Sequence, residues 1–142
     1  MVADGPDRKS PSPLHPLHAV LLAGAVPLFP GALLGDWAYY ASYEIQWKNF
    51  ASWLLVGGLV FGGFALLWAL VDIVRAHGRG RLIIYFLLLL AGWIVGFIDA
   101  LVHAKDAWAS MPDALILSAI AALLCIAATW LGFSTLRAGG TK

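Results

Sequence analysis

The sequence predicts an all-α fold, a polytopic membrane four-helix bundle, and two observations carry that prediction. The 142 residues are 61% hydrophobic and only 12% charged, whereas soluble domains carry about 25% charged residues. In addition, four stretches contain no Asp, Glu, Lys or Arg, and a membrane-spanning helix needs about 20 mostly apolar residues, with about 17 as the lower end. These stretches are residues 10–35, 49–71, 82–98 and 114–136.

We expect one transmembrane domain over residues 16–137, with a polar, flexible leader at 1–15 and a short tail at 138–142. The first apolar run is too long for a secretory signal and continues without a cleavage site, so we interpret it as a retained helix. The short connections favour antiparallel neighbours in up-down-up-down order. The expected helices span residues 17–42, 51–75, 81–104 and 113–136.

The distribution of Lys and Arg predicts the orientation, because the more basic side of a multi-pass protein faces the cytoplasm. Seven basic residues fall on one side: Arg8, Lys9, Arg75, Arg79, Arg81, Arg137 and Lys142. The other side has Lys48 and Lys105. We therefore expect a protein of the bacterial inner membrane with both termini cytoplasmic. Aromatic residues gather on the outer side, as in an interfacial belt: Trp37, Tyr39, Tyr40, Tyr43, Trp47, Phe50, Trp53 and Trp108.

Several functional classes are disfavoured by composition and by missing motifs. A net charge of +1 argues against a nucleic-acid partner and leaves the lipid bilayer as the expected one. The single cysteine, Cys125, cannot form an intrachain disulfide. The sequence has no glycine-rich phosphate loop, cysteine cluster or nucleophile elbow. We therefore assign no catalytic residue and expect a protein that is not an enzyme.

Stripes of small residues lead along the helices to the polar side chains. Small residues mark the contact faces of membrane helices because lipid gives them no hydrophobic reason to associate. Steps of three and four connect Gly and Ala with Asp72 on the second helix, and with Asp99 and His103 on the third. An ionised side chain at the bilayer centre costs about 2.5–3.5 kcal/mol on insertion scales. We therefore expect these polar groups to face inward.

The outer end of the bundle is the first candidate site, with Asp36, Asp99, His103 and Asp106. Asp99 and His103 are four residues apart and share one helix face. Such a pair could relay protons, or orient His103 toward a quinone or a metal ion. The alternative is a structural hydrogen-bonded network that sets the helix register.

The inner end is the second candidate site, with His15, His18 and Asp72. Histidines three residues apart can share a metal ion, so His15, His18 or His103 would be the ligands if a metal is bound. A bis-histidine haem b would need a partner such as His77 from the second connection. The alternative is a helix start, with Pro16 in the first turn and the histidines at the lipid headgroups.

The order of four segments resembles a known family. They are "HPLHAVLLAGAVPLFPGALLGD", "GGLVFGGFALLWALVD", "ALVHAKDAW" and "WLGFSTLRAGG". Over roughly residues 15–140 the chain is similar to the prokaryotic membrane family called domain of unknown function 2231. It departs from the family pattern at Asp99, where Asn is expected, and at "GFSTL", which replaces Gly-Gly-Glu-Leu.

The resemblance implies a membrane partner of periplasmic redox enzymes such as sugar dehydrogenases. We therefore predict a membrane anchor or electron-transfer partner module, associated with a quinone or a haem, for such a dehydrogenase or another membrane subunit. Two alternatives remain: a small proton-coupled carrier or channel subunit, and a purely structural membrane subunit.

Overall fold

A computed structural model describes residues 15–75 and 80–137 of the chain. These residues form five α-helices and no strand. The helices are α1 (Pro16–Ser42), α2 (Ile45–Arg75), α3 (Gly80–His103), α4 (Ala107–Ser110) and α5 (Asp113–Arg137). Most of the expected leader, the tail and His77 lie outside the described residues. Four of the described helices are long and apolar enough to cross a membrane: α1, α2, α3 and α5.

Two helical features differ from the expected boundaries. Helix α2 begins at Ile45 rather than at residue 51, and the four-residue helix α4 lies inside the expected last connection. The reason is that an apolar run marks only the part of a helix that lies in hydrocarbon. A helix can continue past that part through interfacial residues such as Trp47 and Lys48.

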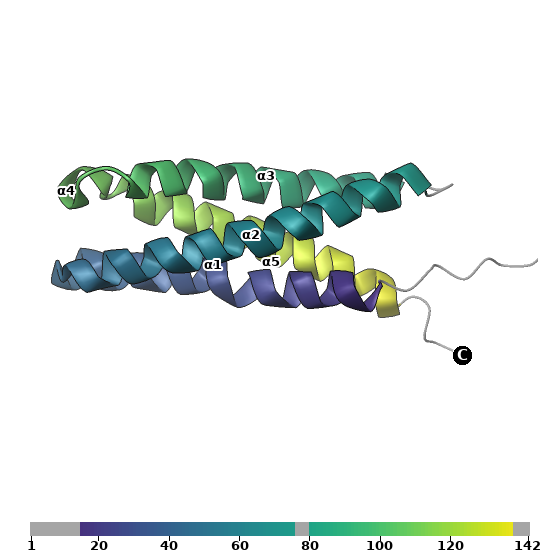
Figure 1. Cartoon of the computed structure of the whole chain (residues 1–142), viewed down its shortest axis with the longest axis horizontal. Helices are drawn as coiled ribbons and strands as arrows, with labels where there is room; N and C mark the ends of the chain where they lie inside the picture. Colours follow the sequence, from purple (N-terminus) through teal and green to yellow (C-terminus); the bar gives the residue numbers. More distant parts are fainter. Residues whose placement is uncertain (1–14, 76–79, 138–142) are drawn as a thin grey trace, which may run out of the picture.

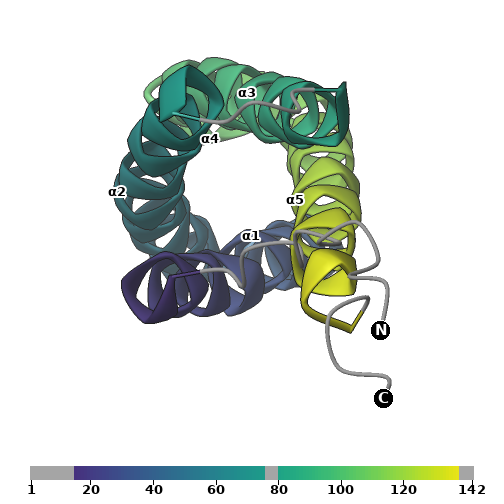
Figure 2. The ribbon, with the colours of Figure 1, turned by 90° about the vertical axis from the view of Figure 1, so that its right-hand side faces the viewer.

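The four long helices form a closed ring (Figures 1 and 2). Helix α1 packs against α2 and α5, and α3 packs against the same two helices. The start of α1 and the end of α5 lie at one end of the bundle, while α4 lies at the other (Figure 1). We call the second one the α4 end.

The interior is built around small residues, as the stripes predict. Gly58, Gly62, Ala65 and Ala69 of α2 are all buried, as are Gly92 and Gly96 of α3. Phe29 of α1 fills the space that two of these glycines leave: a Cβ on Gly58 would lie 3.2 Å from its ring, and one on Gly96 only 2.8 Å. The prediction that the stripes are packing faces is therefore confirmed for α2 and α3.

Helix α1 ends in a conformation that is rare for a large side chain. Tyr43, its C-cap residue, has a φ of 58° in the left-handed region, and its N–H donates to the carbonyl of Tyr39. A bulky residue tolerates this backbone only where its surroundings hold it. The Tyr43 ring stacks on Trp108 of α4, with 5.2 Å between ring centroids, and meets the edge of the Tyr39 ring. These contacts join the α1–α2 connection to α4.

Candidate functional site

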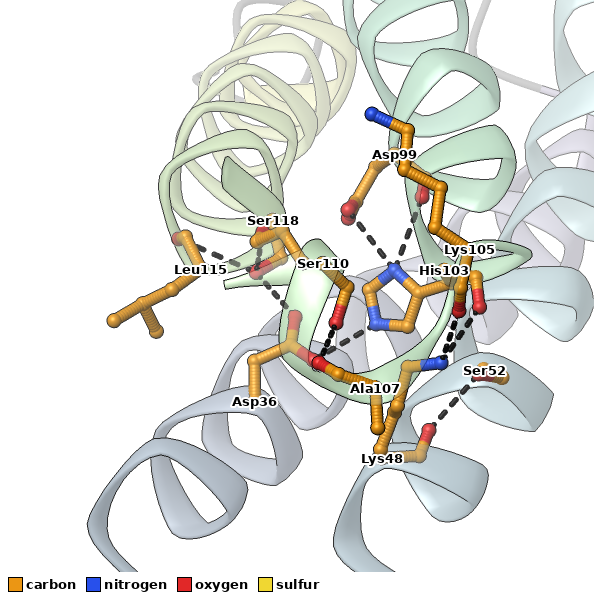
Figure 3. Close-up of polar contacts among 11 residues, drawn as sticks. Asp36, Lys48, Ser52, Asp99, His103, Lys105, Ala107, Ser110, Leu115 and Ser118 are labelled. Carbon is orange, nitrogen blue, oxygen red and sulfur yellow. Dashed lines mark hydrogen bonds and ion pairs between the residues drawn. The ribbon is translucent and has the colours of Figure 1, made fainter. Parts of the chain in front are cut away.

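Three helices bring four polar side chains together near the α4 end (Figure 3). Asp36 comes from α1, Asp99 and His103 from α3, and Ser118 from α5. Asp36 and Asp99 are fully buried, and the other two are at most 6% exposed. We call these four residues the His103 cluster. Three of the four residues predicted for the outer site therefore meet in the folded chain.

The His103 ring is held on both sides by acidic residues. Its Nε2 shares a hydrogen bond of 2.8 Å with Asp36 Oδ1. Its Nδ1 lies 3.0 Å from the backbone oxygen of Asp99 and 3.1 Å from Asp99 Oδ1. Because a backbone oxygen can only accept, Nδ1 carries a hydrogen in this arrangement. The imidazole therefore connects α1 to α3 through its two ring nitrogens.

The two carboxylates of the cluster are satisfied to different degrees. Asp36 also accepts a hydrogen bond of 2.6 Å from Ser118 Oγ, which ties α1 to α5. The Oδ2 of Asp99 is buried and has no hydrogen-bond partner among the described residues. Burying a carboxylate oxygen without a partner is costly. Asp99 is thus the member of the cluster that can accept one more ligand.

Lys48 of α2 lies at the same end of the bundle and binds backbone oxygens at and just after the end of α3. Its ammonium donates to the backbone oxygens of His103 and Lys105, at 2.9 Å each. The last carbonyls of a helix have no partner within the helix, and a cation near them is favourable. Through Lys48 and the His103 cluster, side-chain hydrogen bonds connect all four long helices near the α4 end.

Asp106, the fourth residue predicted for the outer site, is not buried with the others. It is exposed at the N-cap position of α4 and makes no capping hydrogen bond through its side chain. Helix α3 ends at His103, so the helical spacing that brings Asp99 to His103 does not continue to Asp106. Asp106 is therefore close to His103 in the sequence but is not part of the site.

Sequence reasoning did not assign Ser118 and Lys48 to the site. Ser118 lies on the small-residue stripe of the last helix, and this was a usable signal, because a hydroxyl on a packing face needs a partner. Lys48 follows the aromatic Trp47 and was counted only as an outer charge. Its partners are backbone carbonyls, which no side-chain pattern reveals.

A second buried group lies toward the opposite end, where α1 starts. His18 Nε2 and the Tyr85 hydroxyl share a hydrogen bond of 2.7 Å, and His18 Nδ1 lies 3.6 Å from Asp72 Oδ2. His18 is 1% and Tyr85 5% exposed, while the Asp72 side chain is 41% exposed. We call these three residues the His18 cluster. Tyr85 was missed, although it continues the α3 stripe backward from Gly92 by one step of four and one of three.

His15 does not join the His18 cluster. It is exposed at the N-cap of α1, where its Nδ1 accepts a hydrogen bond of 3.3 Å from the N–H of Leu17. Its ring lies against Trp68, with 4.8 Å between centroids. The interpretation of this segment as a helix start, with Pro16 as its first residue, therefore fits His15 but not the buried His18.

The donor geometry of His103 and His18 does not favour a bis-histidine haem. A haem iron needs a ring nitrogen that points at it, whereas both nitrogens of His103 face Asp36 and Asp99. The Nε2 of His18 faces Tyr85. Binding haem at either residue would require these contacts to break. The third histidine considered for this role, His77, lies outside the described residues.

The Tyr85–His18 contact provides a first test of the buried network. We expect Tyr85→Phe to destabilise the bundle by about 1–3 kcal/mol, because it leaves a buried imidazole nitrogen without its partner. The free energy of unfolding would be measured by denaturant titration in mixed detergent micelles. Tyr40→Phe removes a hydroxyl from a half-exposed side chain and serves as the control. Equal stability of the two variants would contradict the assigned role of the hydroxyl.

These features define a class: a multi-pass membrane protein with four span-capable helices and two clusters of ionisable side chains, all buried except the partly exposed Asp72. The chain matches the family described as predicted membrane protein (DUF2231) over residues 14–139. It therefore belongs to this family, which confirms the resemblance found in its sequence. No curated protein and no solved structure matches the chain.

Proposed function

We propose that this protein is a non-enzymatic anchor or electron-transfer partner, possessing a docking surface for a redox enzyme on the non-cytoplasmic face of the bacterial inner membrane. In this proposal the helices cross in up-down-up-down order, with both termini cytoplasmic and the α4 end outside. The charge distribution supports this orientation, because Arg75 and Arg81 flank the connection at the opposite end.

The stack of Tyr43 on Trp108 is the observation that carries the proposal. Both side chains are exposed, Tyr43 by 57% and Trp108 by 77%. Neither residue belongs to one of the four span-capable helices. Tryptophan and tyrosine are enriched among the residues that contribute most of the binding energy at protein interfaces. The strained backbone of Tyr43 indicates that the surrounding structure holds this stack in place.

The buried network below the stack supports the same function. Lys48 and the His103 cluster connect the four long helices by side-chain hydrogen bonds. The segment that carries Trp108 therefore lies next to an end of the bundle whose helices are held together. A docking surface gains affinity when it is ordered before its partner arrives, because less conformational entropy is lost on binding. The partner that the family resemblance implies is a periplasmic dehydrogenase, and a membrane quinone would be the electron carrier.

A photoreactive phenylalanine analogue at position 108 tests this proposal in native membranes. We expect light to produce an adduct with a redox enzyme whose soluble domain is non-cytoplasmic, because Trp108 lies in the proposed interface. Tyr43→Ala should weaken the adduct and release part of that enzyme from the membrane fraction. Trp53→Ala, which changes an aromatic residue that is 77% exposed within α2, is the matched control.

The same probe at Leu123, which is 68% exposed on the span-capable part of α5, reports contacts with lipid and with membrane neighbours. Adducts of the same composition at positions 108 and 123 would contradict a specific docking surface. So would a cytoplasmic partner, since the proposal places α4 outside.

The two buried clusters near opposite ends favour a second candidate, a proton-coupled carrier. Ionisable groups inside a membrane protein mark proton pathways in many pumps and transporters. Between the clusters, however, the interior is lined mainly by Ala, Leu and Phe, which cannot pass on a proton. Thr129 contributes a buried hydroxyl to this apolar interior. Proton flux into vesicles that is lost in Asp99→Asn would favour the carrier, and vesicles that stay tight would favour the anchor.

A further inference from the structure

We infer that Asp36, Asp99 and His103 form a binding site for one divalent transition-metal ion of the zinc class. This inference goes beyond the proposed function and does not depend on it. Each of the three residues offers one ligand atom, and these atoms all lie within 4.8 Å of one another. They come from α1 and α3, so one ion would bridge two helices.

The donor set and its spacing suit such an ion. One imidazole nitrogen with carboxylate oxygens is a mixed set that Zn²⁺ accepts in tetrahedral geometry, with bonds of about 2.0–2.2 Å. Neighbouring donors in such a site lie about 3.3 Å apart, a distance that follows from those bond lengths. In the structure, the three ligand atoms, one from each residue, lie within 4.8 Å of one another, so modest side-chain movements would bring them to this spacing.

Asp99 provides the independent sign of a missing ligand. Its side chain is fully buried and points toward the His103 ring (Figure 3). Neither of its carboxyl oxygens has a hydrogen-bond partner among the described residues, and Oδ1 alone approaches the ring, 3.1 Å from Nδ1. A metal ion would supply that partner. A structural lock made only of hydrogen bonds gives no reason for these oxygens to remain unpaired.

The charge of the site also points to a cation. With both carboxylates ionised and the imidazole doubly protonated, the three side chains would carry a net charge of −1. Lys48 does not balance it by direct pairing, because its ammonium bonds to the backbone oxygens of His103 and Lys105. No ion pair joins Lys48 to either carboxylate in the described part of the chain. A divalent ion with two carboxylates and a neutral imidazole gives a net charge of zero.

We assign Nε2 of His103 as the metal-binding nitrogen, because an ion there would replace the proton shared with Asp36 Oδ1 and keep Asp36 as a ligand. The carboxyl group of Asp99, which lies beside Nδ1, would have to turn toward that ion. The ion takes the lone pair that Nε2 gains when its proton leaves, so one proton is released for each ion bound. Nδ1 can keep its hydrogen bond to the backbone oxygen of Asp99, which is the usual second contact of a metal-binding histidine. Ser118 orients Asp36 in the same way, by donating to its Oδ2.

Calorimetric titration of the full-length protein in detergent, after removal of metal with a chelator, tests the site. We expect one Zn²⁺ per chain, with release of one proton seen as a dependence of the heat on the buffer. Co²⁺ should bind at the same site and show the visible bands of a low-symmetry complex. The unfolding temperature of the wild-type protein should rise with Zn²⁺ concentration, because an ion that binds only the folded state stabilises it.

Asp99→Asn removes a ligand with little change of shape and should weaken Zn²⁺ binding by about 10- to 100-fold or more, the range that loss of an outer-shell partner already causes. Asp106→Asn, an exposed aspartate near the same helix end, is the matched control and should bind like the wild type. If Asp99→Asn does not fold, X-ray absorption of the Zn²⁺-loaded wild type must show one imidazole among oxygen ligands.

Three results would overturn the inference. One is the absence of stoichiometric Zn²⁺ binding to the wild type. Another is unchanged binding in a folded Asp99→Asn variant. The last is an equal loss of binding in Asp106→Asn, which would place the ion on the surface. Because the titration uses the purified chain alone, failure of the metal site leaves the docking proposal untouched, and the photochemical adduct tests that separately.

Discussion

Replacing Asp36 with alanine is expected to destabilise the folded bundle by about 3–5 kcal/mol, the cost of removing one partner from a buried charged pair. The substitution deprives His103 Nε2 and Ser118 Oγ of the same carboxylate, and it leaves the imidazole beside Asp99 without its second acceptor. The unfolding free energy in mixed detergent micelles would measure this loss. Asp106→Ala, an exposed aspartate, should stay within about 0.5 kcal/mol of the wild type.

A double-mutant cycle separates the pair from its surroundings. Replacing Asp36 and His103 together with leucine removes both polar groups, and such replacements of a buried pair are often neutral or stabilising. We therefore expect the double variant to lose much less stability than the sum of the losses in Asp36→Leu and His103→Leu. If the two single losses simply add in the double variant, the pair does not interact as the 2.8 Å contact implies. A stable double variant that retains partner docking would support the purely structural alternative for this cluster.

Gly35→Leu is expected to separate α1 from α2 and to cost about 1–3 kcal/mol or more, the range for overpacking a tight interior. A Cβ at position 35 would lie 3.0 Å from the Cβ of Ala51 and 3.3 Å from its Cα and its backbone nitrogen. Backbone atoms cannot turn aside as a flexible side chain can, so the helices must move. The displacement would also strain the Asp36–His103 contact, one residue further along α1.

Gly80→Ala provides the matched control for this prediction. Gly80 begins α3, and a Cβ there would meet nothing within 4 Å. We expect its stability to equal or slightly exceed that of the wild type, because alanine is the better helix former. If Gly35→Leu and Gly80→Ala have equal free energies of unfolding, the close approach of α1 and α2 does not limit the size of the side chain at position 35.

Much of the fold follows from the sequence because the bilayer limits what a chain can do. Backbone groups in hydrocarbon must be satisfied within the chain, so apolar runs of this length become helices. The cost of burying an ionised group then places Asp36, Asp99 and His103 inward on the packing faces. The inward direction of these three side chains was therefore predictable from spacing and solvent, but their pairing across helices was not.

The membership of the site was less predictable, because it depends on which helices are neighbours. Ser118 contacts Asp36 only because α5 packs against α1, and Tyr85 reaches His18 because α3 begins where α1 begins. Asp106 shows the opposite case, since a local break after His103 turns it out to the surface. Periodicity describes one helix at a time and carries no information on partners across helices.

The sequence by itself determined the family, the four span-capable helices and the inward faces of His18, Asp36, Asp99 and His103, because burial energy acts on each helix alone. Only the tertiary structure decided which polar groups pair. Packing of α1 against α5, and of α3 beside both clusters, sets distances of about 3 Å that no spacing along the chain encodes. Tertiary packing also decided that Asp99 keeps one oxygen unpartnered, the feature from which the metal site is inferred.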